Sequence, residues 1–419
     1  MKVIYTLLMK EIAIIWAWAS WLMAAATLLE SDLKNYHIHL FEKNSSIWNK
    51  VLISWWWRCN VTTGITDKKI LETKYTRGWE FIKKSFWKFS PKKCQEWFIN
   101  HWVPLKVESD MRVFPVSDNG SDVIAVFEDI FAKNRNRITI HYREWIVTVE
   151  KNKEWWFFLN SQESHFECDV LLITTWGNAY AHTWSSWDGY AFARSLGHTV
   201  TKLWPSLSSF LTKEKWLHQL SGLSLPEAMI DGLKWPLLFT HFGISWPLAF
   251  MVSSALAWVD IGKGIVERPS FSPVASMNTK DWDVFLRESF QKSPKKTLVN
   301  ILSEKLPKRF AEGFVGEFFS DLWETYVGSI SKKSRESIAK LLGDGIPLTL
   351  VERRPWDEFV TAWWVHTDEI DSETMQSKIH KNLYFAGEVL NVDGYTGWFS
   401  LQLCWASGYI AGKSISEKS

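Results

Sequence analysis

Residues 10–43 read KEIAIIWAWASWLMAAATLLESDLKNYHIHLFEK, and this stretch decides the fold class. The apolar run Ile12–Ile15 predicts a buried strand, and Ser20–Leu29 predicts a helix that follows it. The alternating segment His37–Lys43 predicts a second strand, near whose end stands the acid Glu42. Strand, turn, helix, strand and terminal acid form the skeleton of a dinucleotide-binding βαβ unit. We therefore expect an α/β protein with a Rossmann-like domain.

The connection between this strand and helix is unusual. It reads WAWASW over residues 16–21, where a βαβ unit of this kind has the glycine pattern GxGxxG. The 18 uncharged residues Ile12–Leu29 also reach the length of a transmembrane helix or signal anchor. The alternating segment 37–43 favours the βαβ unit, and an N-terminal membrane anchor is the less favoured alternative.

Composition sets the broad class. The chain has 419 residues, and 48 basic against 46 acidic side chains give a net charge of +2. This balance shows no electrostatic excess for nucleic acid or an anionic membrane, so we expect neither as a partner. The four cysteines lie far apart without a CxxC pair, which favours reduced thiols in a cytoplasmic protein over disulfides or zinc. We find no metal-binding motif.

Tryptophan is abnormally frequent, with 29 residues against 21 glycines. Several segments keep the spacing of flavoprotein motifs when tryptophans within them are replaced by glycine. They are residues 52–62 (LISWWWRCNVT), 175–190 (TWGNAYAHTWSSWDGY), 239–247 (FTHFGISWP) and 383–399 (LYFAGEVLNVDGYTGWF). With these motifs in this order, the chain resembles the NAD(P)/FAD-dependent oxidoreductases of the two-dinucleotide-binding type, which include aminoacetone oxidases and a bile-acid-reductase-like branch. The resemblance runs from about residue 10 to 413.

The resemblance implies a domain order and an activity. Residues 1–200 would begin the FAD-binding domain, 201–354 would form an inserted β-rich and helical substrate-side domain, and 355–419 would complete the FAD-binding domain. Two electrons would pass between a small organic substrate and the flavin. NAD(P)H or oxygen would be the other redox partner. The oligomeric state is not specified by the sequence.

The resemblance also assigns cofactor-binding residues. Glu42 would accept the ribose hydroxyls of the adenosine half, with Lys43 beside it, although a strand-end acid can also be simply solvated. Arg58 would offset pyrophosphate charge, and Cys59 is expected to be a small packed residue. The remaining positions of the cofactor set are Trp16, Trp18, Trp21, Asn60, Thr62, Gly177, Gly387, Glu388, Gly394, Thr396, Gly397 and Trp398. No catalytic residue is evident; His241 is a weak candidate on the substrate side, where a structural role is more common.

Sixteen tryptophans occupy positions at which the family has glycine. They are Trp16, Trp18, Trp21, Trp48, Trp55, Trp56, Trp57, Trp102, Trp176, Trp184, Trp187, Trp235, Trp246, Trp363, Trp364 and Trp398. Glycine reaches φ > 0 and lets the backbone approach a ligand, and an indole does neither. At about 1 kcal/mol each, the strain would sum to roughly 16 kcal/mol, comparable to the stability of a whole domain. We therefore expect FAD binding to be impaired, or the backbone to have rearranged.

Two other functions compete with the enzyme. A protein without cofactor could hold an apolar or aromatic ligand in a tryptophan-lined cleft of the same fold. Clustered tryptophans also stack on sugars or single-stranded bases, but such platforms usually carry a basic groove, which the charge balance does not indicate. Ligand-induced tryptophan quenching without a flavin spectrum would favour the binding protein.

Overall fold

The computed structural model describes residues 9–15, 19–45, 58–152, 156–175, 188–201, 204–262, 264–354, 360–362 and 365–418. The chain forms two compact units. The first comprises Met1–Trp204 with Val360–Ser419, and the second comprises Pro205–Phe359. The short strands β12 (Trp204–Ser206) and β20 (Val360–Ala362) lie where the chain passes between them.

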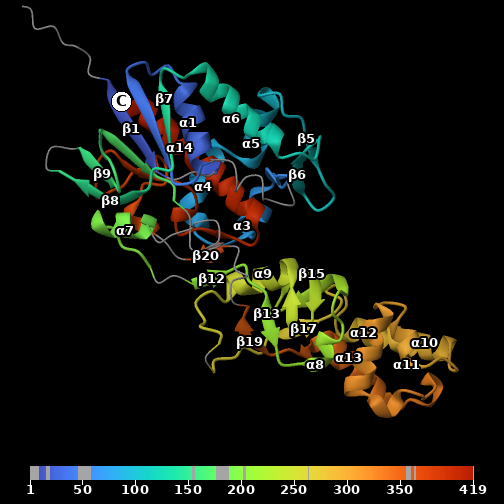
Figure 1. The fold of residues 1–419 in the computed structure, drawn as a ribbon. Coiled ribbons are helices and arrows are strands. Elements are labelled where there is room, and N and C mark those ends of the chain that lie inside the picture. The colour runs from blue at the N-terminus through green and yellow to red at the C-terminus, as the bar shows by residue number, and fades with distance from the viewer. Residues whose placement is uncertain are drawn as a thin grey trace, which may run out of the picture. The chain divides into compact units, whose positions relative to one another are not determined.

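A five-stranded parallel sheet is the centre of the first unit (Figure 1). Its strands, in spatial order, are β21 (Leu383–Phe385), β11 (Val170–Ile173), β1 (Lys10–Ile15), β2 (Tyr36–Glu42) and β7 (Ile138–Tyr142). Central parallel strands are covered on both faces, which explains the unbroken apolar run at the end of β1. The βαβ prediction is confirmed, and the uncharged run of residues 12–29 is divided between β1 and the helix α1 (Ala19–Leu29).

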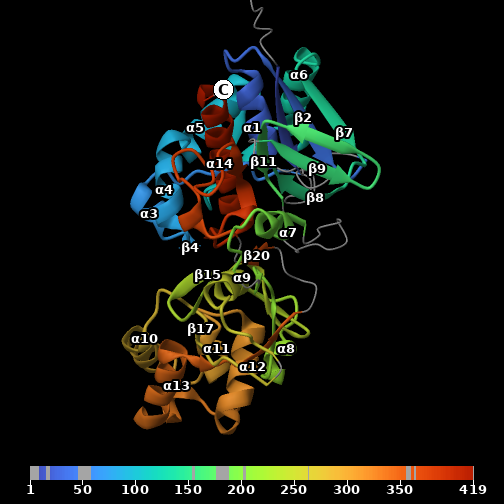
Figure 2. The ribbon, with the colours of Figure 1, turned by 90° about the vertical axis from the view of Figure 1, so that its left-hand side faces the viewer.

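Helices cover one face of this sheet. They include α1, α5 (Pro91–Asn100), α6 (Ser121–Lys133) and the long α14 (Gly397–Lys418). Figures 1 and 2 show α14 lying along α1. A Cβ added to Gly408 would lie 2.2 Å from the carbonyl oxygen of Ser20, and one at Gly412 would lie 2.6 Å from that of Ala24. The two helices therefore pack so closely that only glycine fits at these points.

The other face of the sheet carries a small antiparallel sheet. It consists of β8 (Ile146–Lys151), β9 (Phe157–Ser161) and β10 (His165–Cys168). Phe166 of β10 meets Phe41 of β2 edge-on, with ring centroids 4.8 Å apart. This gives the first unit three layers.

Short elements complete the first unit. β3 (Thr62–Thr63), β6 (Arg112–Pro115) and β5 (Leu105–Val107) form one small sheet, and β4 (Tyr75–Arg77) pairs with β22 (Asp393–Gly394). The remaining elements are α3 (Lys68–Glu72), α4 (Trp79–Lys88), α7 (Asp188–Ser195) and the 3-10 turns η4 (Thr367–Glu369) and η5 (Gly387–Val389). Ser90 caps α5, because its side chain accepts a hydrogen bond from the Lys93 N–H and Pro91 opens the helix.

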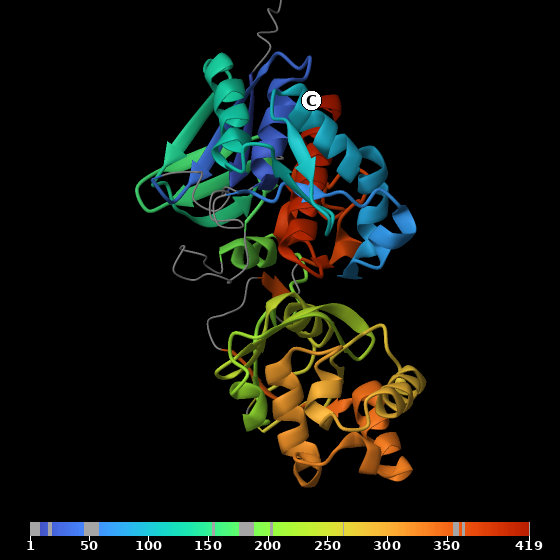
Figure 3. The ribbon, with the colours of Figure 1, turned by 90° about the vertical axis from the view of Figure 1, so that its right-hand side faces the viewer.

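The second unit is built on a seven-stranded sheet (Figure 3). The order is β18 (Ile346–Pro347), β17 (Ser270–Ser272), β14 (Ser224–Ile230), β15 (Leu233–Thr240), β16 (Gly243–Ser245), β13 (Phe210–Thr212) and β19 (Leu350–Arg353). β14 begins at Ser224. Gly222, at φ +83°, belongs to the turn before it.

Helices pack around this sheet, and the orange ones gather at one end of the unit in Figure 3. They are α8 (Lys215–His218), α9 (Trp246–Ala255), α10 (Thr279–Lys292), α11 (Leu298–Leu302), α12 (Lys308–Phe318) and α13 (Lys332–Asp344), with η2 (Ser320–Leu322) and η3 (Val327–Ser329). Pro294 follows the end of α10 and Pro307 precedes α12, and both prolines lie outside the helices, where the missing N–H breaks no helical hydrogen bond. Phe239, Phe271 and Phe310 form an aromatic core between strands and helices.

Candidate cofactor-binding site

The carboxyl ends of the central parallel strands form the edge at which a dinucleotide binds in such folds. β1 ends at Ile15, which pairs with Phe41, so Glu42 stands one residue beyond the end of β1 at this edge of the sheet. The Glu42 side chain is buried, and its Oε1 accepts hydrogen bonds from the N–H of Asn44 at 2.8 Å and from its Nδ2 at 2.6 Å. The solvated alternative for Glu42 is therefore excluded. Trp16 and Trp18 of the adjacent turn, and Gly177, lie outside the described residues.

The half-buried cation Lys43 follows Glu42 in the chain. The ammonium of Lys43 is 3.9 Å from Asp188 Oδ2 at the start of α7, and 5.6 Å from the ring centroid of Trp145. Trp145 Nε1 donates to the same carboxylate oxygen at 3.2 Å. Burial lowers the pKa of Lys43 to about 8, while Asp188 and Glu42 act against that shift. Sequence reasoning missed Trp145, because its contact with Lys43 joins different strand ends.

The loop after β2 leads to Arg58, whose guanidinium engages acidic side chains of the same unit. It donates to Glu108 Oε1 at 2.6 Å and, through Nε, to Asp118 Oδ1 at 2.9 Å, and it lies 3.9 Å from the ring centroid of Phe114. These carboxylates, Glu108 first, raise the pKa of Arg58. A pyrophosphate would compete with them, so the expected role of Arg58 stays a prediction.

The residues that follow Arg58 are packed into the core. Cys59 is fully buried, as expected for a packed residue, with φ at +55°. The Thr62 hydroxyl donates to Gln402 Oε1 of α14 at 2.6 Å. Asn60 Oδ1 accepts from the Val113 N–H at 3.2 Å, whereas its buried Nδ2 has no hydrogen-bond partner among the described residues. Asn60 thus keeps a donor for a ligand, and Thr62 is committed to holding α14.

The C-terminal motif returns to the same end of α1. Gly387 has φ +80°, and its N–H donates to Ser407 Oγ at 2.8 Å. A Cβ at Gly387 would lie 2.4 Å from Ser20 Oγ, so glycine is required there. Glu388 follows as a buried acid in η5.

Residues 394–398 comprise the segment before α14 and the first two residues of that helix. A Cβ at Gly394 would lie 2.4 Å from Phe399 Cβ, whereas Gly397, the first residue of the helix, has open space on that side. Thr396 is buried, and its Oγ1 has no hydrogen-bond partner among the described residues. Trp398 is buried against the Phe399 ring, at 5.6 Å between centroids.

Five of the sixteen tryptophans at family glycine positions have described side chains. Trp21 is 1% exposed and stacks on Phe131 of α6 at 5.9 Å, so the core accommodates this indole. Trp102 and Trp246 adopt φ of +66° and +74°, the region that glycine favours. Trp235 lies half-buried in β15, and Trp398 is described above. The other eleven fall in segments outside the description.

His241 belongs to the second unit, in the turn between β15 and β16. Its side chain is exposed and its ring lies 5.1 Å from that of Phe242. Its contact with substrate stays a prediction.

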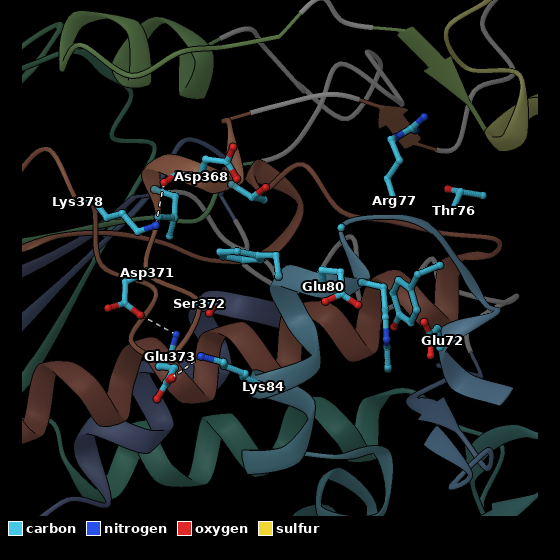
Figure 4. Close-up of a pocket in the computed structure, with 16 residues that line it drawn as sticks. Glu72, Thr76, Arg77, Glu80, Lys84, Asp368, Asp371, Ser372, Glu373 and Lys378 are labelled. Atoms are coloured by element: carbon cyan, nitrogen blue, oxygen red, sulfur yellow. Dashed lines mark hydrogen bonds and ion pairs between the residues drawn. The ribbon is translucent and has the colours of Figure 1, made fainter. Parts of the chain in front are cut away.

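The first unit also has an open cavity of about 760 Å³ beside β4, α4 and η4 (Figure 4). Charged side chains of both signs line it, including Glu72, Arg77, Lys84, Asp368 and Glu373. Within the described ranges, no three His, Cys, Asp or Glu side chains gather to hold a metal ion. Nor does any described helix have the length and apolarity that crossing a bilayer requires.

Comparison with known families agrees with this geometry. The model described as "HI0933-like protein Rossmann domain" matches residues 10–414. The chain belongs to this family. HI0933-like proteins are FAD-dependent oxidoreductases with a Rossmann-type domain, so the predicted family and fold class are confirmed.

Among the relatives of this HI0933-like protein is a 3-dehydro-bile acid delta(4,6)-reductase of Clostridium scindens. It is 26% identical, over 98% of this chain and 100% of its own length. A ribosomal RNA dihydrouridine synthase of Haemophilus influenzae is 25% identical, over 98% and 99%. A solved Escherichia coli quinol fumarate reductase is 11% identical with a TM-score of 0.46, over 98% of this chain and 70% of that chain.

Proposed function

We propose that this protein is an FAD-dependent reductase that transfers two electrons between the flavin and an organic substrate. The observation that carries the proposal is the buried Glu42 carboxylate at the carboxyl end of β2, one residue beyond the level at which the parallel strand β1 ends. In Rossmann-type units an acid at this position accepts hydrogen bonds from a ribose. The family match over residues 10–414 supports the same cofactor.

The described residues fit FAD. Two buried polar groups, Asn60 Nδ2 and Thr396 Oγ1, have no hydrogen-bond partner among the described residues, and each belongs to a family cofactor motif. The amide N–H groups that open α14 at Gly397 would favour an anion or a polar ring edge. When bound, FAD supplies a ring that accepts or donates a hydride. The protein's contribution is to bury the Glu42 carboxylate, to orient the segment that enters α14 and to exclude water from Thr396.

The names of the two relatives support one class of reaction. One is named as a reductase of a bile acid and the other as a synthase of dihydrouridine in ribosomal RNA. Both names describe adding hydrogen to an unsaturated compound. We propose the same reaction class here, with a small molecule as substrate, NAD(P)H as the source of electrons and the cytoplasm as the location. The charge balance of +2 favours a small molecule over RNA.

We further propose that the indoles at positions 16 and 18 weaken FAD binding. In the GxGxxG turn, the first glycine makes the tight turn and the second lets the backbone approach the pyrophosphate. An indole at position 18 would occupy that volume. Trp21, at the third position, packs on Phe131 in the core and is best left unchanged in a test.

The decisive experiment compares absorption spectra of the purified chain and of the Trp16→Gly/Trp18→Gly variant after incubation with FAD and gel filtration. Released flavin is identified after denaturation. We expect little flavin on the unaltered chain and close to one FAD per chain on the variant. Trp258→Gly, an exposed indole of the second unit, is the matched control and should change nothing.

Each outcome has a distinct meaning. Stoichiometric FAD on the unaltered chain would refute the steric argument but support the enzyme. A folded double variant that binds no FAD would overturn the proposed function. Ligand-induced tryptophan quenching in such a colourless variant would favour the cofactor-free binding protein.

A further inference from the structure

One short strand holds the segment that leads into α14. β4 pairs in antiparallel fashion with β22, Arg77 opposite Asp393 and Tyr75 opposite Gly394. The Tyr395 N–H donates to the Lys74 carbonyl at 2.9 Å. The segment from 393 to 395 is thus attached by backbone pairing to a strand more than 300 positions earlier in the chain.

Side chains of β4 extend this attachment on both sides of the pairing. Thr76 Oγ1 donates to the Asp393 carbonyl at 3.2 Å, and the buried Tyr75 hydroxyl donates to the Phe399 carbonyl in the first turn of α14 at 2.9 Å. A Cβ at Gly78 would lie 2.7 Å from the Asn391 carbonyl oxygen. The two segments therefore approach as closely as their backbones allow.

A buried ion pair lies at the centre of this attachment. The Arg77 guanidinium donates to Asp393 Oδ2, and their side chains are 15% and 3% exposed. Burial raises the pKa of Asp393, and Arg77 acts against that rise. Removing one member of such a pair leaves a buried charge without compensation, which is strongly destabilising at that point.

Arg77 also lines the open cavity. It is among the residues that line the cavity in Figure 4, with Glu72, Glu80 and Lys84 on the neighbouring helices. Sequence motifs pointed to residues 393–398 but not to residues 74–78, because the latter resemble no cofactor motif.

We propose that Arg77 is the positioning residue for the 393–397 segment, holding Asp393 so that Gly394, Thr396 and the first amides of α14 keep the arrangement that receives the flavin ring. The cofactor part of this inference, that the segment receives the flavin ring, rests on the proposed FAD function. Its structural part, that Arg77 orders the segment, holds with or without the cofactor.

The test uses the full chain and four variants. Arg77→Met removes the charge, Arg77→Lys keeps it, and Arg77→Met/Asp393→Asn removes both charges. Lys84→Met is the matched control, because Lys84 also lines the cavity and forms an ion pair, with Glu373 at 2.7 Å, a residue outside the 393–397 segment. Amide hydrogen exchange over residues 393–399 is measured first without FAD, with β1 as internal reference.

We expect Arg77→Met to accelerate exchange over 393–399 by roughly tenfold or more relative to β1, since its buried partner loses compensation. Arg77→Lys and Lys84→Met should stay within about threefold of the unaltered chain. The double variant should regain the unaltered thermal midpoint but keep the fast exchange. Restored protection in the double variant would overturn the proposal, because it would show that Arg77 merely neutralises Asp393.

The cofactor part is then measured in the Trp16→Gly/Trp18→Gly background by FAD affinity and by the flavin absorption band. The Arg77→Met change should weaken FAD affinity by roughly tenfold and alter the band shape, and Arg77→Lys should restore both. Unchanged affinity and spectrum would refute the positioning role. If the background itself binds no FAD, the proposed function fails, while the exchange result still decides whether Arg77 orders the segment.

Discussion

Trp102 stands at a position where a helix end requires a left-handed residue. After α5 ends, Val103 donates its N–H to the Phe98 carbonyl at 3.0 Å, and Trp102 donates to the Ile99 carbonyl at 3.0 Å. These two bonds define a Schellman motif, whose left-handed residue is usually glycine. Trp102 has φ +66°, and its side chain is 93% exposed. The indole is therefore almost unburied, so its contacts do not offset the strain of the left-handed backbone.

The free energies follow from this geometry. A left-handed non-glycine residue costs about 1–2 kcal/mol, and glycine loses about 0.4–1 kcal/mol through the greater freedom of the unfolded chain. With 7% of the side chain covered, the lost indole contacts are worth less than about 0.5 kcal/mol. We expect Trp102→Gly to be more stable than Trp102→Ala by about 1 kcal/mol, because both lose the indole but only glycine relieves the strain.

The assay measures the free energy of unfolding of the first unit in urea. Hydrogen exchange of the amides in β1 and α5 is the readout, because both elements belong to that unit. A gain of 1 kcal/mol corresponds to about 2–4 °C in a thermal midpoint for a unit of this size. Trp87 is the matched control: it is 54% exposed but lies within α4, where glycine is less stable than alanine by about 1 kcal/mol. Equal stability of Trp102→Gly and Trp102→Ala would refute the strain argument.

Three further predictions concern other contacts of the first unit. Thr62→Val removes the hydrogen bond to buried Gln402 and should lower the free energy of unfolding by about 1–3 kcal/mol, measured by urea titration. A loss of less than about 0.5 kcal/mol would contradict this prediction. Ser90→Ala removes the cap of α5 and should cost about 0.5–2 kcal/mol by the same assay, whereas Ser90→Asp should retain stability. Burial lowers the pKa of His37 and His141 below the unfolded value of about 6.5, so the folded state binds fewer protons and stability should fall as pH drops below that value. Unfolding midpoints between pH 7.5 and 5 check this, and His141→Gln should flatten the profile.

Much of the fold was predictable because its signals are local. The apolar run of β1, the alternation of β2 and the proline breaks before α11 and α12 each depend on residues close in sequence. The Ser90–Pro91 start of α5 is equally local. The acid Glu42 was predicted because a βαβ unit places it a set distance after the first strand.

The arrangement around the candidate site was not predictable in the same way. Arg58 matches a cofactor motif, yet its guanidinium contacts Glu108 and Asp118, acids that no motif links to it. Trp21 stands at a position where the family has glycine, yet Phe131 provides a stacking partner for its indole. Spacing along the chain carries no information about which distant side chain will face a residue.

The sequence by itself determined the family, the βαβ start and the positions at which tryptophan stands for glycine, because these follow from local periodicity and motif order. Only the tertiary structure decided that Thr62 holds α14 through Gln402, and that Arg77 compensates Asp393 from a strand outside every motif. Both contacts join residues more than 300 positions apart. Such pairs are selected by burial, which forces each polar group to find a partner wherever the packed chain supplies one.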